Sequence, residues 1–169
     1  MKRIVIGAVL TGVIIVIKMM VEYYFGIHSD KLHIAPYFVY LRYVIFLAAY
    51  LLVFYKIPFK GFKDFTGKGL VFFAIVAMIV GVGHFVYHSA INPDFEEDYK
   101  KFLIEKVEQN QEMKAEHKEI KIKEIEKRLK EYHWMNTPVG AMIFYFVETF
   151  IVGILYTLIG SWAFRKRKT

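Results

Sequence analysis

The sequence contains no cysteine, so disulfide bonds, cysteine-ligated zinc, iron–sulfur clusters and thiol catalysis are all excluded. Charge is also missing from long parts of the chain. Although 23% of the 169 residues are charged, several windows of about 20 residues are almost free of charge. A window of that length can cross the hydrocarbon core of a bilayer as a helix. The distribution of charge therefore indicates a membrane protein.

Apolar residues are abundant: 56% of the chain is hydrophobic and 18% is aromatic. We predict an all-α integral membrane protein, a single membrane domain with four transmembrane helices. The spans are expected at residues 4–25, 36–55, 69–91 and 138–164, with a helical extracytoplasmic insert at residues 93–136 between the third and fourth. The first span resembles a signal peptide, but no small-residue cleavage site follows it, so we expect an uncleaved anchor.

Basic residues next to the spans predict the orientation. The N-terminus, residues 56–68 and the tail Arg165-Lys166-Arg167-Lys168 hold ten Lys or Arg residues against one acid, Asp64. By the positive-inside rule, both termini are expected to be cytoplasmic in a bacterial inner membrane, with residues 93–136 outside. The same rule accounts for the net charge of +7, so we expect the lipid bilayer as a partner and no nucleic acid.

The insert carries ten basic and twelve acidic residues, together with two apolar stripes at helical spacing. Asn92-Pro93 is a favourable helix start, and residues 109–111 are the expected break. We predict a helical hairpin whose apolar face rests on the membrane surface or on the bundle. A coiled coil that binds a partner is the alternative. The stripes consist of Phe95, Tyr99, Phe102, Leu103 and Val107, and of Ile122, Ile125, Leu129 and Tyr132.

Four segments resemble a known family: Asn92-Pro93-Asp94-Phe95, Lys130-Glu131-Tyr132, residues 62–69 and residues 149–155. They are similar to the domain of unknown function 4199 family of Bacteroidota inner-membrane proteins, which has four spans and a long charged insert before the last. The resemblance implies this fold and no catalytic residue or cofactor. Its similarity to proteins found near polyprenyl-phosphate glycosyltransferases implies an accessory role beside such an enzyme.

Ionisable side chains inside spans are functional candidates, because each costs roughly 2.5–3.5 kcal/mol at a helix centre. Four of them, one from each predicted span, fall at a similar depth on the outer side, and two lie about one turn further out. A shared polar layer could be a register-fixing ion-pair network, or a binding or translocation site; snorkelling without a common site is the third alternative. The predicted cluster consists of Lys18, Glu22, Arg42, His84, His88 and Glu148.

His84 and His88 share a helix face at a spacing of four, which suits a metal ion. No third ligand is specified and the HExxH motif is absent, so we assign no metal site. All six histidines fall on the predicted outer side, which leaves metal binding and pH sensing as alternatives.

The last span carries a stripe of small residues at intervals of four: Thr149, Gly153, Thr157 and Ser161. Small residues let helices approach closely in a membrane. We predict packing within the bundle, with a homodimer seam as the alternative. Ala8 and Gly12 form a weaker version of this pattern in the first span.

Three functions are compatible with these patterns. We favour a non-enzymatic accessory or scaffold subunit, because the basic segments suit anionic lipid phosphates; the family resemblance implies that its partner is a polyprenyl-phosphate glycosyltransferase. The first alternative is a transporter or an ion- or proton-binding protein that uses the polar cluster, although the inner halves of the predicted spans hold no ionisable residue. The second is a lipid-modifying enzyme built on His84, His88 and Glu148, although no nucleophile–base pair is specified.

Overall fold

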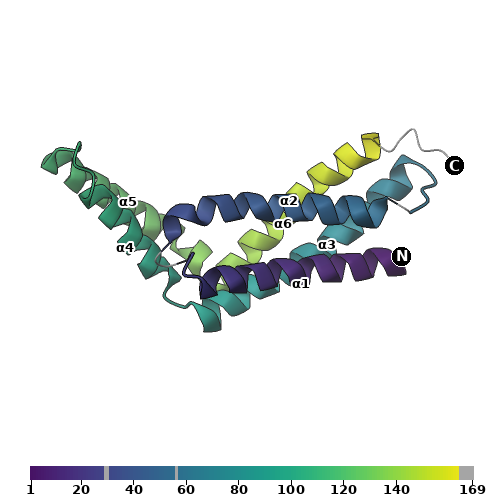
Figure 1. Ribbon diagram of the computed structural model, residues 1–169, viewed down its shortest axis with the longest axis horizontal. Coiled ribbons are helices and arrows are strands. Elements are labelled where there is room, and N and C mark those ends of the chain that lie inside the picture. The colour runs from purple at the N-terminus through teal and green to yellow at the C-terminus, as the bar shows by residue number, and fades with distance from the viewer. Residues whose placement is uncertain (29–30, 56, 164–169) are drawn as a thin grey trace.

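The computed structural model describes residues 1–28, 31–55 and 57–163, and every described element is a helix (Figure 1). Four helical segments are long and apolar enough to cross a membrane, and a helical pair outside them separates the third from the fourth. The predicted fold class is thereby confirmed. The elements in order are α1 (Lys2–Tyr24), η1 (Leu32–Ile34), α2 (Ala35–Phe54), α3 (Phe62–Val86), the π-helix η2 (Tyr87–Ile91), α4 (Phe95–Glu108), α5 (Ala115–Asn136) and α6 (Pro138–Ala163).

Helix α3 begins at Phe62, seven residues before the start expected at Gly69. Gly61 precedes the helix with φ 137°, a conformation that suits glycine. In the first turn, the Asp64 carboxylate accepts a 3.0 Å hydrogen bond from the Lys60 amide and pairs with Lys68 at 2.7 Å. Because these charged residues lower the local hydropathy, the prediction from hydropathy placed the start of the helix two turns too late. Lys56 and the predicted ends of the last span and tail, residues 164–168, lie outside the described residues.

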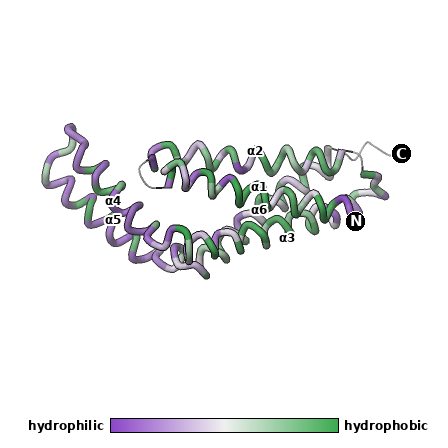
Figure 2. Tube along the Cα trace, turned by 60° about the horizontal axis from the view of Figure 1, so that its bottom comes forward, coloured by the Kyte–Doolittle hydropathy of each residue, from purple (hydrophilic) through white to green (hydrophobic). Residues whose placement is uncertain are grey.

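The predicted hairpin is present, with its break between Glu108 and Ala115. Helix α5 packs on α4 and on the start of α6. Lys100 pairs with Glu126 at 2.9 Å, and His133 with Glu96 at 2.7 Å. The hairpin is hydrophilic and projects away from the four apolar helices (Figures 1 and 2). The base of α4 lines a cavity of the bundle, and the end of α5 packs on α6. Contact of the apolar face of the hairpin with the membrane surface stays a prediction.

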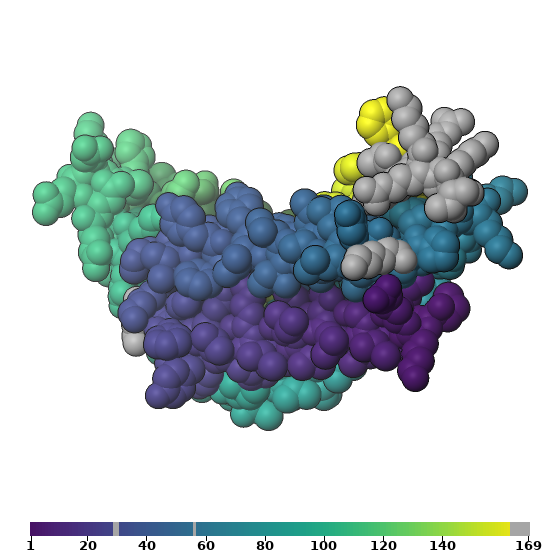
Figure 3. All heavy atoms as spheres, turned by 45° about the vertical axis from the view of Figure 1, so that its right-hand side comes forward, coloured from purple at the N-terminus to yellow at the C-terminus, as the bar shows by residue number. Residues whose placement is uncertain are grey.

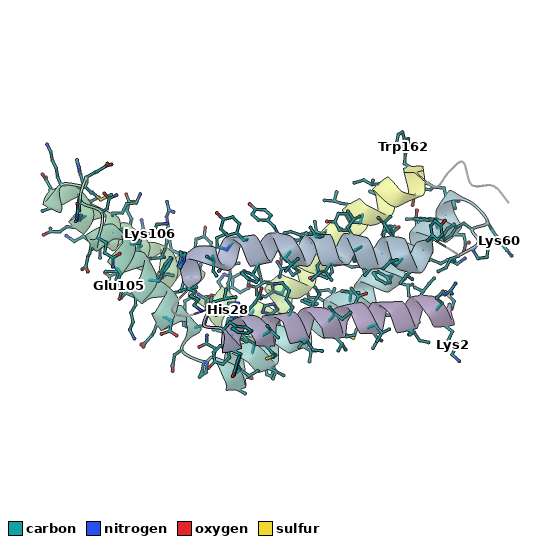
Figure 4. The ribbon with its side chains drawn as sticks, in the orientation of Figure 1. Lys2, His28, Lys60, Glu105, Lys106 and Trp162 are labelled. Carbon is teal, nitrogen blue, oxygen red and sulfur yellow. The ribbon has the colours of Figure 1, made fainter. Side chains whose placement is uncertain are left out.

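We call the end of the bundle that bears the hairpin the insert end. Lys2, Lys60 and Trp162 lie at the other end, which we call the opposite end (Figure 4). A basic and aromatic set at one end of a bundle is typical of a membrane interface. Helices α1 and α2 lie side by side and form one face of the molecule (Figure 3).

The stripe on α6 packs against α3 inside this chain. Thr149, Thr157 and Ser161 are each at most 3% exposed. A Cβ added to Gly153 would meet the ring of Phe73, so α3 and α6 are in close contact there. The stripe is therefore buried in packing within the chain, and a seam between two copies on another face stays a prediction.

The half of the bundle toward the opposite end is filled by aromatic rings. The Tyr50 ring is tilted against those of Phe54 and Phe73, with ring centroids 4.5 Å and 5.4 Å away. Dense edge and tilted contacts of this kind exclude water. We call the set the aromatic cluster; its members, each at most 3% exposed, are Phe46, Tyr50, Phe54, Phe65, Phe72 and Phe73.

Candidate functional site

A cavity of about 710 Å³ lies at the insert end, between α2 on one side and α1, α3 and η2 on the other. The base of α4 contributes a further wall. Five of the six polar residues predicted from the sequence line this cavity: Lys18, Glu22, Arg42, His84 and His88. The sixth, Glu148 on α6, does not line the cavity but pairs with Arg42.

Arg42 is held at the deep end of the cavity. It is 7% exposed, and its guanidinium lies between the rings of Tyr43 and Tyr145, at 5.2 Å and 5.3 Å from their centroids. Its Nη2 donates to Glu148 Oε1 at 2.6 Å, and the Tyr43 hydroxyl donates to the same oxygen. The pair uses one atom from each partner. Arg42 Nε and Glu148 Oε2 are buried and have no hydrogen-bond partner among the described residues.

Lys18 and Glu22 form the ion pair within α1 that their spacing predicts. Glu22 is 5% exposed, so this carboxylate has left water almost completely and requires the lysine as its partner. Lys18 also lies 5.8 Å from the centroid of the Phe38 ring on α2. The pair thus sits where α1 faces α2 across the cavity.

The two histidines of α3 and η2 lie on the same wall, with ring centroids 6.1 Å apart. His84 stacks almost parallel on Tyr145, at 3.4 Å between centroids, and its buried Nδ1 has no hydrogen-bond partner in the described part of the chain. Within the described ranges, no group of three or more metal-ligating side chains is placed to hold an ion. The histidine pair therefore lacks the further ligands that a structural or catalytic metal needs.

His28 belongs to this site but was not selected from the sequence, because it lies in the loop after α1. Asn92 Nδ2 donates to the Tyr87 hydroxyl at 2.9 Å, and that hydroxyl shares a hydrogen bond with His28 Nδ1, 2.7 Å away. His28 Nε2 faces Glu22 at 3.7 Å. Burial, and next the charge of Lys18, lower the pKa of His28 to about 4, so the ring is neutral at pH 7.

A π-helical turn positions Tyr87 in this network. Such turns are short insertions in α-helices that often occur at functional sites. Here the turn η2 ends the third span, and both Tyr87 and His88 are buried at it. No hydropathy pattern signals this turn, so the sequence prediction of one regular helix to residue 91 missed it.

The wall formed by α4 is apolar. Phe95, Tyr99, Phe102 and Leu103 line the cavity along one side of the helix, and Lys106 follows them. Figure 4 places His28 at the base of the hairpin and Lys106 further out along α4. The cavity is thus polar at its deep end, apolar beside the hairpin and basic at its outer edge.

Five side chains of the predicted cluster line one cavity and the sixth, Glu148, pairs with Arg42 beside it, which is the arrangement expected of a shared polar layer. A role for that layer in binding stays a prediction.

Comparisons with known proteins give the family but no activity. No curated protein and no solved structure matches the chain. The model of the family described as "Protein of unknown function (DUF4199)" matches residues 7–166, which is nearly the whole chain. The family resemblance noted in the sequence is therefore confirmed, and the chain belongs to the DUF4199 family.

Proposed function

We propose that this is a non-enzymatic membrane protein that binds a ligand in the cavity at the insert end and acts as an accessory subunit. One observation carries the proposal: a cavity of about 710 Å³, with charged groups at its deep end, lies directly beside a fully packed aromatic cluster. A volume of this size is typical of small-molecule sites. Its position between the spans places a ligand against Glu22 and Arg42, which are only 5% and 7% exposed.

The packing argues for binding rather than passage. Beyond Arg42, α2 contributes Phe46, Tyr50 and Phe54, which are at most 1% exposed. A path through the bundle would have to pass these rings, and the buried polar side chains beside them on α6 are neutral hydroxyls, those of Thr149, Thr157 and Ser161. The cavity is therefore a pocket closed toward the opposite end. This arrangement disfavours the transporter alternative.

The hydrogen bonds argue against catalysis. In the enzyme alternative, Glu148 would act with His84 or His88, but its Oε1 accepts from Arg42 and Tyr43 instead. His84 is stacked on Tyr145 and forms no hydrogen bond with a carboxylate among the described residues. General acid–base chemistry needs a base within hydrogen-bond reach of a nucleophile or an acid. The observed contacts support a structural and binding role for this carboxylate.

The accessory role is supported by the hairpin, which projects from the bundle and exposes charged side chains along α5. By family resemblance, the partner we propose is a polyprenyl-phosphate glycosyltransferase of the same membrane. We also propose that the membrane is the bacterial inner membrane, with the hairpin outside. A pull-down in native lipid tests the partnership: recovery of the protein without any membrane enzyme would contradict it.

Native mass spectrometry of the protein extracted with its own lipid tests the binding role. We expect a bound small molecule or lipid on the wild type. Met19→Trp should remove it, because the buried Met19 side chain lines the cavity and indole is larger. Val9→Trp, on an exposed position of the same helix, is the matched control and should retain the ligand. Equal amounts of bound ligand in the two variants would overturn the proposal.

A further inference from the structure

The proposed binding role does not define the chemistry of the ligand. The charged side chains that line the cavity limit which classes of ligand it can bind. Three basic side chains, Lys18, Arg42 and Lys106, line the cavity together with one carboxylate among the described residues, Glu22. Glu148 neutralises Arg42 from outside the lining. With both carboxylates counted, one positive charge remains in excess. This excess charge is carried by Lys106, an exposed side chain at the outer edge of the cavity, where it attracts an anion toward the cavity and repels a cation.

Unused donors are present at the deep end. Arg42 is more than nine-tenths buried, lines the cavity and keeps Nε without a partner among the described residues. A buried guanidinium N–H that lacks an acceptor is costly, so an acceptor from a ligand would be favourable there. Lys18 uses one of its three donors on Glu22. Two cationic donors from opposite walls suit a carboxylate or a phosphate.

The walls require an apolar body on the same ligand. Phe38, Phe95 and Phe102 line the cavity together with other apolar side chains. An inorganic anion would occupy a small part of about 710 Å³ and leave these rings uncovered. A hydrocarbon chain or ring beside them would gain the usual free energy of apolar burial.

We propose that the cavity binds an organic anion, in which a carboxylate or phosphate lies at Arg42 and Lys18 and an apolar body lies against α2 and α4. This inference rests on the binding role proposed above and defines the ligand class for it. The ligand could be drawn from the bilayer as an acidic lipid or from water as a soluble organic acid, because both present the same chemistry to the site.

The test uses the full chain in nanodiscs of zwitterionic phosphatidylcholine and measures binding by native mass spectrometry and by thermal shift. Dodecanoate and dodecyl phosphate represent acidic lipids, and 4-phenylbutyrate represents a soluble organic acid. Dodecanol and dodecyltrimethylammonium keep the chain but carry no charge or a positive one. Inorganic phosphate carries the charge without an apolar body.

Three matched variants accompany the probes. Arg42→Gln removes the central donor but leaves Glu148 unpaired and could unfold the protein. The double variant Arg42→Gln with Glu148→Gln removes the whole pair without leaving a lone charge. Lys60→Gln removes a charge at the opposite end, far from the cavity.

We expect at least one of the three organic anions to bind the wild type and the Lys60→Gln variant equally. Its affinity should fall at least tenfold in the double variant, and inorganic phosphate should not bind. Tight binding of dodecanoate or dodecyl phosphate but not 4-phenylbutyrate would assign a lipid source, and the reverse pattern a soluble one.

Equal binding of dodecanol or of the cationic amphiphile would overturn the anion assignment while leaving the binding role intact. Unchanged anion affinity in the double variant would overturn it as well. If none of the organic anions binds, the ligand class is wrong, and the Met19→Trp measurement then decides the binding role independently.

Discussion

Arg42 Nη2 lies 2.6 Å from Glu148 Oε1 and joins α2 to α6 across 106 positions of the chain. Replacing one member leaves the other charge buried without compensation. We expect Glu148→Gln to lower the free energy of unfolding by about 2–3 kcal/mol, near the lower end for buried pairs because this carboxylate is 22% exposed. Thermal unfolding in detergent measures the loss.

The double variant Arg42→Gln with Glu148→Gln should lose less stability than the two single variants together. The difference gives the energy of the pair itself in a double-mutant cycle. Strict additivity would show that the two side chains do not interact in the membrane protein.

Gly153 allows α6 to approach Phe73 on α3, because an added Cβ would overlap that ring. Gly153→Ala should therefore reduce stability by about 1–3 kcal/mol, the usual cost of overpacking. Gly67→Ala on α3 is the control, since its Cβ would meet nothing within 4 Å and alanine favours a helix. Equal melting temperatures for the two variants would contradict close α3–α6 packing.

The pKa of His28 predicts an acid-sensitive stability. The folded protein holds this pKa at about 4 through burial and the charge of Lys18, whereas the unfolded chain has the ordinary 6.5. Between these values the unfolded state binds more protons, so stability is complete above pH 6.5 and declines as the pH falls toward 4. The decline attributable to His28 is up to about 1.4 kcal/mol per pH unit.

Melting temperatures from pH 7 to pH 4 test this dependence. His28→Gln should flatten the curve over that window. His117→Gln, on an exposed position of α5, should leave the wild-type slope unchanged. A wild-type slope in the His28→Gln variant would show that other groups cause the decline.

Cysteine labelling tests the proposed orientation, since the wild-type chain has no thiol of its own. Lys121→Cys on the hairpin and Lys60→Cys at the opposite end place single exposed thiols at the two ends of the bundle. A membrane-impermeant maleimide applied to spheroplasts should label the first and not the second. The reverse pattern would place the hairpin in the cytoplasm.

The aromatic cluster predicts an absence of ion flux. Proteoliposomes that contain the wild type or Glu148→Gln should show the same proton leak as each other and as empty vesicles. The physical reason is the layer of buried rings from α2 and α3 below Arg42. A leak in the wild type that Glu148→Gln abolishes would restore the transporter hypothesis.

The spans and the hairpin were predictable because hydropathy and helical spacing act over long windows, which average out single residues. The sequence could predict that Lys18, Arg42 and Glu148 lie at a similar depth in the membrane, because helices that span a bilayer run roughly parallel. The sequence could not predict every pairing partner. The spacing of four residues predicts that Lys18 pairs with Glu22 on one helix, but the pairing of Arg42 on α2 with Glu148 on α6 depends on how the two helices are rotated.

Other parts of the site left no pattern in the sequence. His28 acts from a loop, and the π-helical turn at Tyr87 depends on local backbone geometry that no periodicity reports. The early start of α3 was hidden by Lys63, Asp64 and Lys68, which are favourable at an interface but score against a span.

The two parts of α2 are held by different kinds of contact. The last turns of α2 pack in the aromatic cluster. The middle of the helix contacts α6 through polar groups: Arg42 pairs with Glu148, and the Tyr156 hydroxyl donates a 3.3 Å hydrogen bond to the Tyr43 carbonyl. Pro36 lies about 9 Å further along the axis. An anion that competes with Glu148 for Arg42 would weaken this connection to α6, so the part of α2 that lines the cavity would be held less firmly while the anion is bound.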